Sequence, residues 1–448
     1  MSLLKEEKIE SAEGAVVGSV ETTATDPSLN IDFTASKTQV RERNQEGHEG
    51  LIADLSSALD PRDRTFAAMS LGYLGDPKVI PALEMAILTR SENIFVLEAA
   101  LRSISQYGES AAHSHLSVAR LVNHDSPIVR LAAIQALDSF KLESHTLLSI
   151  ISGRLIDPAV TVRREVARIL SDLPSEQLRD VLPRATHLLE IGEGDRRLVF
   201  DLLKIVEKAG RESPEATSAV RLRLRDCEVD VRIKAAEALS RMGSHVKIAG
   251  WDLYSIVINA LENITLRRES AIALRVHRHF EEEILMDLGR VIEEEILENN
   301  KDKIKEVLSL KREVIDLIGD FGPRAQKAAP YLREALKSEE SVLISAAADA
   351  LARLEAFEVL IDALNSTDIL VMQCITDAIK GMVHKLKHSK RVRLVALLKL
   401  KFAWVKEARL LDSIMALLRT LEAIDQAERQ NNPEALQAPI DFSIPLQA

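Results

Sequence analysis

A helical segment recurs along the chain at a fixed spacing, and this repeat limits the possible folds more than any other feature. The eight residues Arg130–Leu137 have counterparts at Arg64–Leu71, Leu97–Ile104, Arg163–Leu170 and Arg196–Leu203, each 33 residues from the next. Repeats of this length are typical of solenoids. With more variable steps of 36, 35, 44, 33 and 28 residues, the series continues at Arg232–Leu239, Arg267–Leu274, Lys311–Ile318, Ile344–Leu351 and Met372–Ile379, and a weaker unit follows around Val405–Leu418.

The residue types within the repeat predict how it packs. The eighth position is Leu or Ile in all ten segments, the fourth is small or medium, and the first is Arg or Lys in seven. Offsets of three, four and seven residues lie on one helical face. Intervening segments such as Val79–Leu88 supply a second amphipathic helix. One helical pair cannot bury its apolar stripe alone, so the sequence predicts an all-α chain, a right-handed α-solenoid of about ten or eleven pairs.

The ends and the one long step suggest how the chain is divided. Residues 1–46 have nine acidic and five basic side chains without apolar periodicity, which predicts a disordered, acidic tail. The 44-residue step indicates an acidic insertion near Glu281–Asp302, where the solenoid is expected to break. We therefore predict repeat segments at 47–280 and 281–428, followed by an extended tail at 429–448.

Composition narrows the functional classes. Aromatic residues make up 4% of the chain and the net charge is −11, which disfavours base stacking and a wholly basic surface. The two cysteines cannot form a disulfide framework, and neither a secretory h-region nor a membrane-length apolar run is present. A cytoplasmic protein without a transmembrane segment is expected.

The turns resemble those of a known repeat family. The segment Leu74-Gly75-Asp76-Pro77-Lys78-Val79-Ile80-Pro81-Ala82-Leu83 resembles the turn and first helix of a HEAT repeat of the bacterial lyase-like type, and Gly322–Leu332 is similar. The resemblance covers roughly residues 47–425. It implies that the second helices line a concave face, but it indicates the fold and says little about function. We predict a non-catalytic scaffold or adaptor that binds a protein partner through the concave face, through the basic C-terminal repeats, or through both. A lyase or modifying-enzyme subunit and a nucleic-acid-associated protein remain alternatives, because one fold hosts many functions.

Basic residues recur near the start of the second helices. The resemblance implies that the first of them forms a ladder with turn acids such as Asp60, Asp125, Asp157, Asp226 and Asp230. This structural ladder would comprise Arg64, Arg130, Arg163, Arg196, Arg232 and Arg267. A second line could face a partner or could be a solvated face balanced by nearby acids. It comprises Arg164, Arg168, Arg197, Lys204, Arg268, Arg275 and Arg312.

Charge is also concentrated near the C-terminus. Residues 380–409 contain ten Lys or Arg and one acid, Glu407, whereas residues 281–298 contain eight acids and one Arg. The basic stretch could bind an acidic protein, a nucleic-acid backbone or an anionic membrane, or it could be a solvated face. Nucleic acid is the less favoured partner. The candidate partner-binding residues here are Lys385, Lys387, Lys390, Arg391 and Arg393.

Signals of catalysis are weak, so we expect no enzyme activity, metal or cofactor. The pairs His113/His115 and His277/His279 are two residues apart, which places their rings on different helical faces. Among HEAT enzymes, deoxyhypusine hydroxylase uses repeated His-Glu dipeptides, but this chain has one, at His48. HEAT-type DNA glycosylases use aromatic residues in a basic groove, and the two tryptophans here lie on distant units.

One tripeptide occurs in both tails. Ile31-Asp32-Phe33 lies in the N-terminal tail and Ile440-Asp441-Phe442 in the C-terminal one. Each could be a linear motif that docks on the solenoid or on a partner. A chance match between two tails is the alternative.

Overall fold

The computed structural model describes residues 47–89, 93–277, 284–296, 300–366, 368–404, 408–431 and 440–442. Within these ranges the chain forms α-helices and short 3-10 helices and no β-strand, which confirms the all-α prediction. None of these helices is long and apolar enough to cross a membrane. The predicted disordered tail, residues 1–46, lies outside the described residues.

The α-helices alternate between two layers along the chain. The even-numbered helices are α2 (Gly47–Ser57), α4 (Ile80–Leu88), α6 (His115–Leu121), α8 (Ser144–Ile151), α10 (Leu182–Glu190), α12 (Pro214–Leu222), α14 (Gly250–Ile258), α16 (Leu285–Glu293), α18 (Ala329–Ala335), α20 (Phe357–Ala363) and α22 (His388–Trp404). The odd-numbered helices are α3 (Pro61–Leu74), α5 (Ile94–Gln106), α7 (Pro127–Ser139), α9 (Val160–Asp172), α11 (Arg196–Ala209), α13 (Val229–Arg241), α15 (Ile264–His277), α17 (Lys301–Asp320), α19 (Ser341–Arg353), α21 (Ile369–Val383) and α23 (Ala408–Asn431). They make eleven pairs, which we call units 1 (α2 and α3) to 11 (α22 and α23).

Short 3-10 helices complete many of the connections. They are η3 (Pro77–Val79), η4 (Gly108–Ser114), η5 (Ser152–Ile156), η6 (Ser175–Gln177), η7 (Arg223–Arg225), η8 (Ser244–Ala249) and η10 (Gly322–Ala328).

Local sequence sets where the helices begin and end. Asp60 and Asp195 accept hydrogen bonds from the first-turn N–H groups of α3 and α11, which satisfies donors that have no partner within the helix. Pro61 and Pro127 occupy first helical positions, where the missing N–H costs nothing. Gly75 ends α3 with φ of 72°, a left-handed conformation that glycine adopts without strain.

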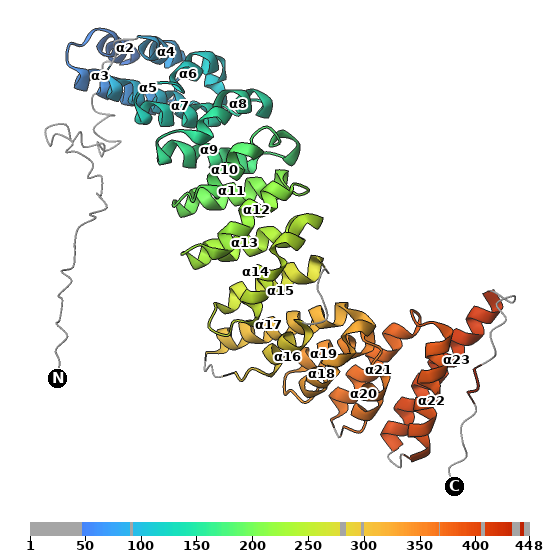
Figure 1. Cartoon of the computed structure of the whole chain (residues 1–448). Coiled ribbons are helices and arrows are strands. Elements are labelled where there is room, and N and C mark those ends of the chain that lie inside the picture. The colour runs from blue at the N-terminus through green and yellow to red at the C-terminus, as the bar shows by residue number, and fades with distance from the viewer. Residues whose placement is uncertain are drawn as a thin grey trace, which may run out of the picture.

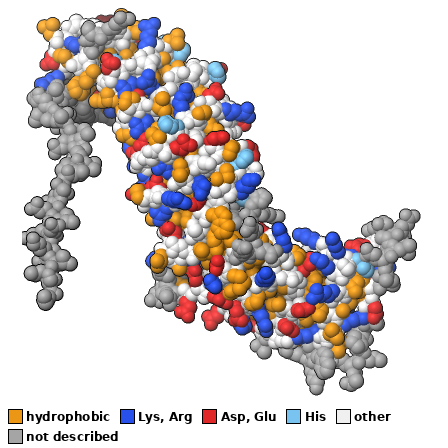
Figure 2. Space-filling view, in the orientation of Figure 1, with side chains coloured by type: hydrophobic (Ala, Val, Ile, Leu, Met, Phe, Trp, Pro, Cys, Tyr) orange, Lys and Arg blue, Asp and Glu red, His pale blue; other side chains and the backbone are white. Residues whose placement is uncertain are grey.

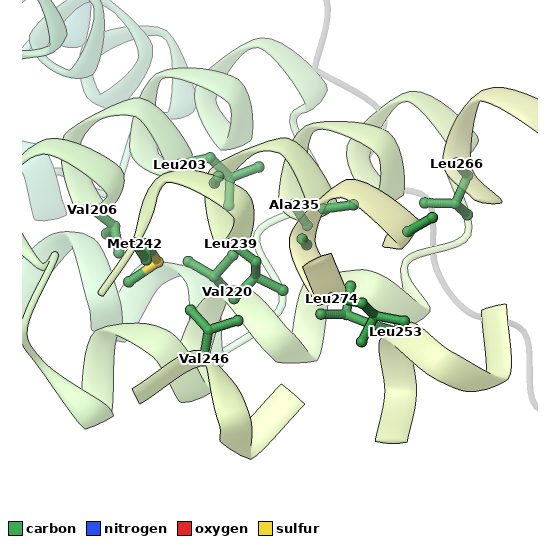
Figure 3. Close-up of a cluster of buried hydrophobic side chains, with 14 of the residues drawn as sticks. Leu203, Val206, Val220, Ala235, Leu239, Met242, Val246, Leu253, Leu266 and Leu274 are labelled. Carbon is green, nitrogen blue, oxygen red and sulfur yellow. The ribbon is translucent and has the colours of Figure 1, made fainter. Parts of the chain in front are cut away.

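The core lies between the stacked units, in the register that the repeat predicted. Each odd-numbered helix packs against the next odd-numbered one, from α3 to α23. The fourth and eighth positions of all ten segments are at most 2% exposed, as Ala133 and Leu137 illustrate. Figure 3 shows one such cluster, in which Leu203, Leu239 and Leu274 come from three successive odd-numbered helices.

Small residues bring the odd-numbered helices close together. A Cβ added to Gly72 would lie 2.6 Å from the Ser103 side-chain oxygen, so α3 and α5 approach too closely there for any larger residue. The Ser103 hydroxyl donates to the Ala68 carbonyl at 2.8 Å and is 1% exposed. The small positions of the repeat thus set the distance between units.

The array is elongated and changes direction once, near α15 to α17 (Figure 1). The long sequence step is explained by α17, which has 20 residues and begins ten residues before Lys311. The stack of odd-numbered helices continues through this region, because α15 packs on α17 and α17 on α19. The division into segments at residue 281 and the right-handed superhelix stay predictions.

Leu137→Ala should destabilise the array, because Leu137 is fully buried between units. The expected loss is ~2–5 kcal/mol, measured as a shift in the urea unfolding midpoint. Gln135→Ala, on the exposed side of the same helix, is the matched control and should change stability by less than about 0.5 kcal/mol. Equal effects of the two substitutions would contradict the assigned register.

Candidate partner-binding surface

Arginines near the start of the odd-numbered helices tie each unit to its own turn. The Nη1 atoms of Arg64, Arg130, Arg163 and Arg232 donate to the carbonyls of the residues six and five positions earlier. These carbonyls follow the even-numbered helix of the same unit. A cation is stabilised at the carbonyl end of a helix, so the guanidinium avoids the unfavourable start of its own helix.

Three of these arginines, and Arg267 with them, also reach the next unit. Arg130 pairs with Asp157 at 2.6 Å, and Arg163 pairs with Glu193 at 2.6 Å. The corresponding acids are Glu262 for Arg232, at 2.8 Å, and Glu294 for Arg267, at 2.7 Å. The acid comes from the following turn each time, so we call these four contacts the inter-unit ladder.

Asp157 is the most buried acid of the inter-unit ladder. Its residue exposure is 2%, and burial alone would raise the pKa of its carboxyl. Hydrogen bonds from Arg130 and from the Ala159 N–H outweigh burial and hold the pKa below its usual value. Asp157 therefore favours the folded state above about pH 4, and this contribution is lost as the pH falls further.

Arg196 pairs with Asp230 of the next unit, one of the acids named from the sequence, but it does so from a different position in its helix than the other ladder arginines. It is the first residue of α11 rather than the fourth, and its pair with Asp230 at 2.8 Å is more than half exposed on both sides. A residue that sequence reasoning missed, Arg223 in η7, is buried at this junction and donates to the Leu189 and Glu193 carbonyls. The sequence feature that could have indicated this buried arginine is its place between two leucines, Leu222 and Leu224.

The predicted basic line on the odd-numbered helices is largely neutralised. Arg164 pairs with Asp195, while Arg168 lies 2.6 Å from Asp138 and Lys204 lies 2.8 Å from Asp172. Arg197 is exposed and forms no ion pair with any residue that the structure describes. On the face shown in Figure 2, basic and acidic side chains are interspersed along the units.

The remaining members of this line cluster where the array bends. Arg268 pairs with its neighbour Glu269 at 2.6 Å, and Arg312 lies 3.9 Å from Asp316. Arg275 of α15 lies 2.6 Å from Glu313, 3.5 Å from Asp316 and 3.4 Å from Asp320, all on α17. Arg353 of α19 pairs with Asp316 at 2.7 Å from the other side. These ion pairs fasten α17 to both neighbours.

The C-terminal basic cluster is also partly neutralised. Arg391 is 2% exposed and pairs with Glu428, Lys390 pairs with Glu355, and Arg393 lies 2.7 Å from Glu358. Lys385 and Lys387 are exposed and form no ion pair within the described part of the chain. A sequence count of +9 therefore overstates the free positive charge.

The described residues offer neither a cluster of metal ligands nor a disulfide. They contain no group of three or more His, Cys, Asp or Glu side chains able to hold a metal ion. Cys227 is exposed, Cys374 is half-buried, and both are free thiols. Trp251 is 63% exposed and contacts the Tyr254 ring edge-to-face at 5.6 Å.

The inter-unit ladder stops at unit 8, and two grooves open there. The equivalent residues in units 8 to 10 are Lys311, Ile344 and Met372. Lys311 is 7% exposed, its ammonium donates to the Glu294 carbonyl, and burial lowers its pKa. The residues that follow it in the series are apolar and offer no charge for the next turn.

The first groove, between units 8 and 9, has a volume of about 500 Å³. Its lining includes Ile292, Leu308, Lys311, Glu334, Glu339 and Glu340. The second, between units 9 and 10, has a volume of about 420 Å³. Its lining includes Leu336, Lys337, Asp362, Asn365, Asp368 and Val371, and Ser338 lines both grooves.

Three exposed aliphatic residues either line these grooves or are next in sequence to a lining residue. Ile296 lines the first groove and is 37% exposed, and Val342, 49% exposed, precedes the groove residue Leu343. Ile369 follows the groove residue Asp368 and is 48% exposed. We call the two grooves and these three side chains the unit 8–10 groove.

Comparisons with known proteins agree with the repeat assignment. The family model for HEAT repeats matches residues 49–137, so this part of the chain consists of HEAT repeats. No curated protein sequence matches the chain. The comparisons do not bear on the bacterial lyase-like type.

Solved structures of similar fold include an engineered protein and yeast importin-β (Kap95p). The engineered protein is 17% identical, with a TM-score of 0.42, and the match covers 84% of this chain and 98% of that one. Importin-β is 11% identical, with a TM-score of 0.42, and the match covers 88% of this chain and 59% of that one. The chain thus spans less than two thirds of importin-β.

Replacing Asp157 should be costly, because it leaves the Arg130 guanidinium buried without its acid. We expect Asp157→Ala to lose ~3–5 kcal/mol, seen as faster amide hydrogen exchange in α7 and α9. Arg196→Ala removes an exposed pair instead and should cost only ~0–1 kcal/mol.

The pH dependence separates this buried pair from general destabilisation. The difference between wild type and Asp157→Ala should be constant from neutral pH down to about pH 4 and shrink below it. A difference that already shrinks at neutral pH would contradict the lowered pKa of Asp157.

Proposed function

We propose that this chain is a non-catalytic scaffold or adaptor that binds a protein partner through the unit 8–10 groove. A solenoid presents an extended surface built from successive units, which suits the recognition of another polypeptide. We also propose a cytoplasmic location, because the free thiols of Cys227 and Cys374 are typical of a reducing compartment.

The observation that carries this proposal is the opening of the surface where the inter-unit ladder stops. An arginine fork can join its own turn and the next one at the same time, as Arg130 does. Lys311 has a single charged atom, which is directed to the Glu294 carbonyl. Among the described residues, Lys311 therefore joins no acid in the turn of unit 9. The groove beside it, which the Arg353–Asp316 pair does not line, leaves room for a ligand.

The lining suggests the chemistry of the partner. Glu339 and Asp362 are exposed carboxylates, one in each groove, and neither forms an ion pair with a described residue. Ile296 provides exposed apolar area within the first groove. We infer that the partner presents a segment with aliphatic side chains and Lys or Arg.

Lys385 and Lys387 support a second candidate site, for an acidic partner. They are exposed and unpaired among the described residues, unlike Lys390, Arg391 and Arg393. Two exposed charges attract an acidic partner less strongly than the ten counted in the sequence would. Their attraction is also limited in range, because exposed charges are screened over a Debye length of ~8 Å at physiological salt. A nucleic-acid partner would need more free basic residues than these.

Reversing the groove carboxylates should weaken partner binding. The groove variant is Glu339→Lys with Asp362→Lys, and the partner is identified by affinity capture and mass spectrometry and then purified. We expect the Kd to rise about tenfold or more, ~1.4 kcal/mol, with most of the loss at low salt.

Two controls make this test specific. Asp54→Lys with Asp180→Lys introduces the same charge change at exposed positions far from the groove and should leave binding intact. Lys385→Glu with Lys387→Glu tests the acidic-partner alternative. If the groove variant binds like wild type at both salt levels, the proposed surface is wrong; loss only in the Lys385/Lys387 variant would assign recognition to the last units.

A further inference from the structure

A short stretch of the C-terminal tail lies against the last unit. Ile440 is 8% exposed and belongs to the hydrophobic core, and Phe442 is half-buried and packs against that core. Between them, the Asp441 carboxylate accepts a hydrogen bond from the Lys399 ammonium of α22 at 2.8 Å. The tripeptide thus contacts the array through two apolar side chains and one ion pair.

The spacing of these side chains suits recognition of an extended segment. In an extended chain, residues two apart point to the same side, so Ile440 and Phe442 can be buried together. Asp441 is 74% exposed as a side chain, whereas Lys399 is only 17% exposed. Apolar burial would provide most of the affinity, and the Lys399 contact would select for an acid in the middle.

The same tripeptide occurs near the other end of the sequence. Ile31-Asp32-Phe33 is followed by Thr34, and Ile440-Asp441-Phe442 is followed by Ser443, so a hydroxyl residue comes next in both. The N-terminal copy lies outside the described residues. A site that accepts one copy has the chemistry to accept the other.

The N-terminal copy cannot reach this site within its own chain. Thirteen residues separate Phe33 from α2, and at ~3.3–3.6 Å each they span at most ~45 Å. Ten steps between eleven units, at ~8–10 Å per step, make an array ~80–100 Å long. Figure 1 shows α2 and α23 at opposite ends of an array that does not close on itself.

We propose that the site around Lys399 binds Ile31-Asp32-Phe33 of a second copy of this chain. The C-terminal tripeptide occupies the site in cis, and its short tether gives it the higher effective concentration. The N-terminal copy of another molecule replaces it when the protein is concentrated or when the C-terminal tail is held elsewhere. The resulting contact is head-to-tail and extends into chains of molecules. It does not depend on the function proposed for the unit 8–10 groove.

Binding of a labelled peptide tests the site directly. A fluorescent peptide of residues 28–37 is titrated into the full chain and into Ile440→Ala/Phe442→Ala, and anisotropy is measured. Affinity should increase at least tenfold in the variant, because the competing tripeptide is weakened. A peptide carrying Ile31→Ala and Phe33→Ala should not bind.

A charge swap makes the test specific for Lys399. Adding Lys399→Glu to the Ile440→Ala/Phe442→Ala protein should lower the affinity for the peptide at least tenfold. A peptide with Asp32→Lys should regain affinity for that protein. Lys327→Glu changes an exposed lysine of η10 that forms no ion pair with a described residue, and this control should have no effect. The proposal is overturned if the peptide binds none of the proteins, or if Lys327→Glu weakens peptide binding as much as Lys399→Glu does.

Assembly of the intact chain gives a second readout. By sedimentation velocity, Ile440→Ala/Phe442→Ala should form larger species as concentration rises, and adding Ile31→Ala/Phe33→Ala should restore the monomer. If the first variant unfolds α22 and α23, the wild-type chain replaces it, with a peptide of residues 436–446 as competitor. If the C-terminal tripeptide is instead a fixed structural cap, neither the variant nor the wild-type chain will bind the peptide or assemble. That result would refute the proposed exchange of tripeptides.

Discussion

Burial of an apolar stripe between successive odd-numbered helices is the interaction on which the rest of this structure depends. No single unit can bury its own apolar stripe, so a hydrophobic core forms only where neighbouring units pack together. Ala67, Ala100 and Ala133 occupy the fourth position and are at most 1% exposed. Their small size lets the backbones approach, and close packing then gives many dispersion contacts per unit. Stability is therefore shared between adjacent units and not concentrated in one central core.

Charge pairing follows this packing and refines it. Once two units are stacked, the carbonyl end of one turn and an acid of the next lie within reach of a single arginine fork, as at Arg130. Where the fork is replaced by Lys311, Ile344 and Met372, the same stacking leaves open grooves. The two larger grooves thus lie where the series of arginines has ended, whereas the pocket between α3 and α5 has a volume of only about 140 Å³.

The sequence revealed the architecture because the repeat is local, but it misjudged the charges because their partners are not. Leu137 and its counterparts could be placed from residues within one helix. The partner of Arg391 is 37 residues away and that of Lys390 is 35 residues away, each about one repeat along the chain. A count over thirty consecutive residues cannot include such acids. Charges in a solenoid sequence are better summed with those one repeat before and after.

The same argument explains why Arg196 makes an exposed pair and not a buried one. A constant step of 33 aligned it with Arg163, but α11 begins three residues later in this register than α9 does. The fourth and eighth positions are still buried despite this later start, since Val199 and Leu203 are both at most 2% exposed. The arginine contacts did change, because a guanidinium forms hydrogen bonds only with carbonyl and carboxylate oxygens at specific positions. Apolar positions can thus be assigned from periodicity alone, whereas polar contacts require the helix boundaries.

The ends of such an array are chemically unlike its middle. An internal unit is covered on both sides, but unit 11 has a helix pair on one side only, and the terminal repeats of solenoids need a cap to stay soluble. Here Ile440 and Phe442 contribute apolar cover that is attached only by a tail. A cover of three residues is small enough to be exchanged, unlike a whole terminal repeat. A chain that carries the same three residues at its other end therefore has the means to join its own copies without any new surface on the solenoid.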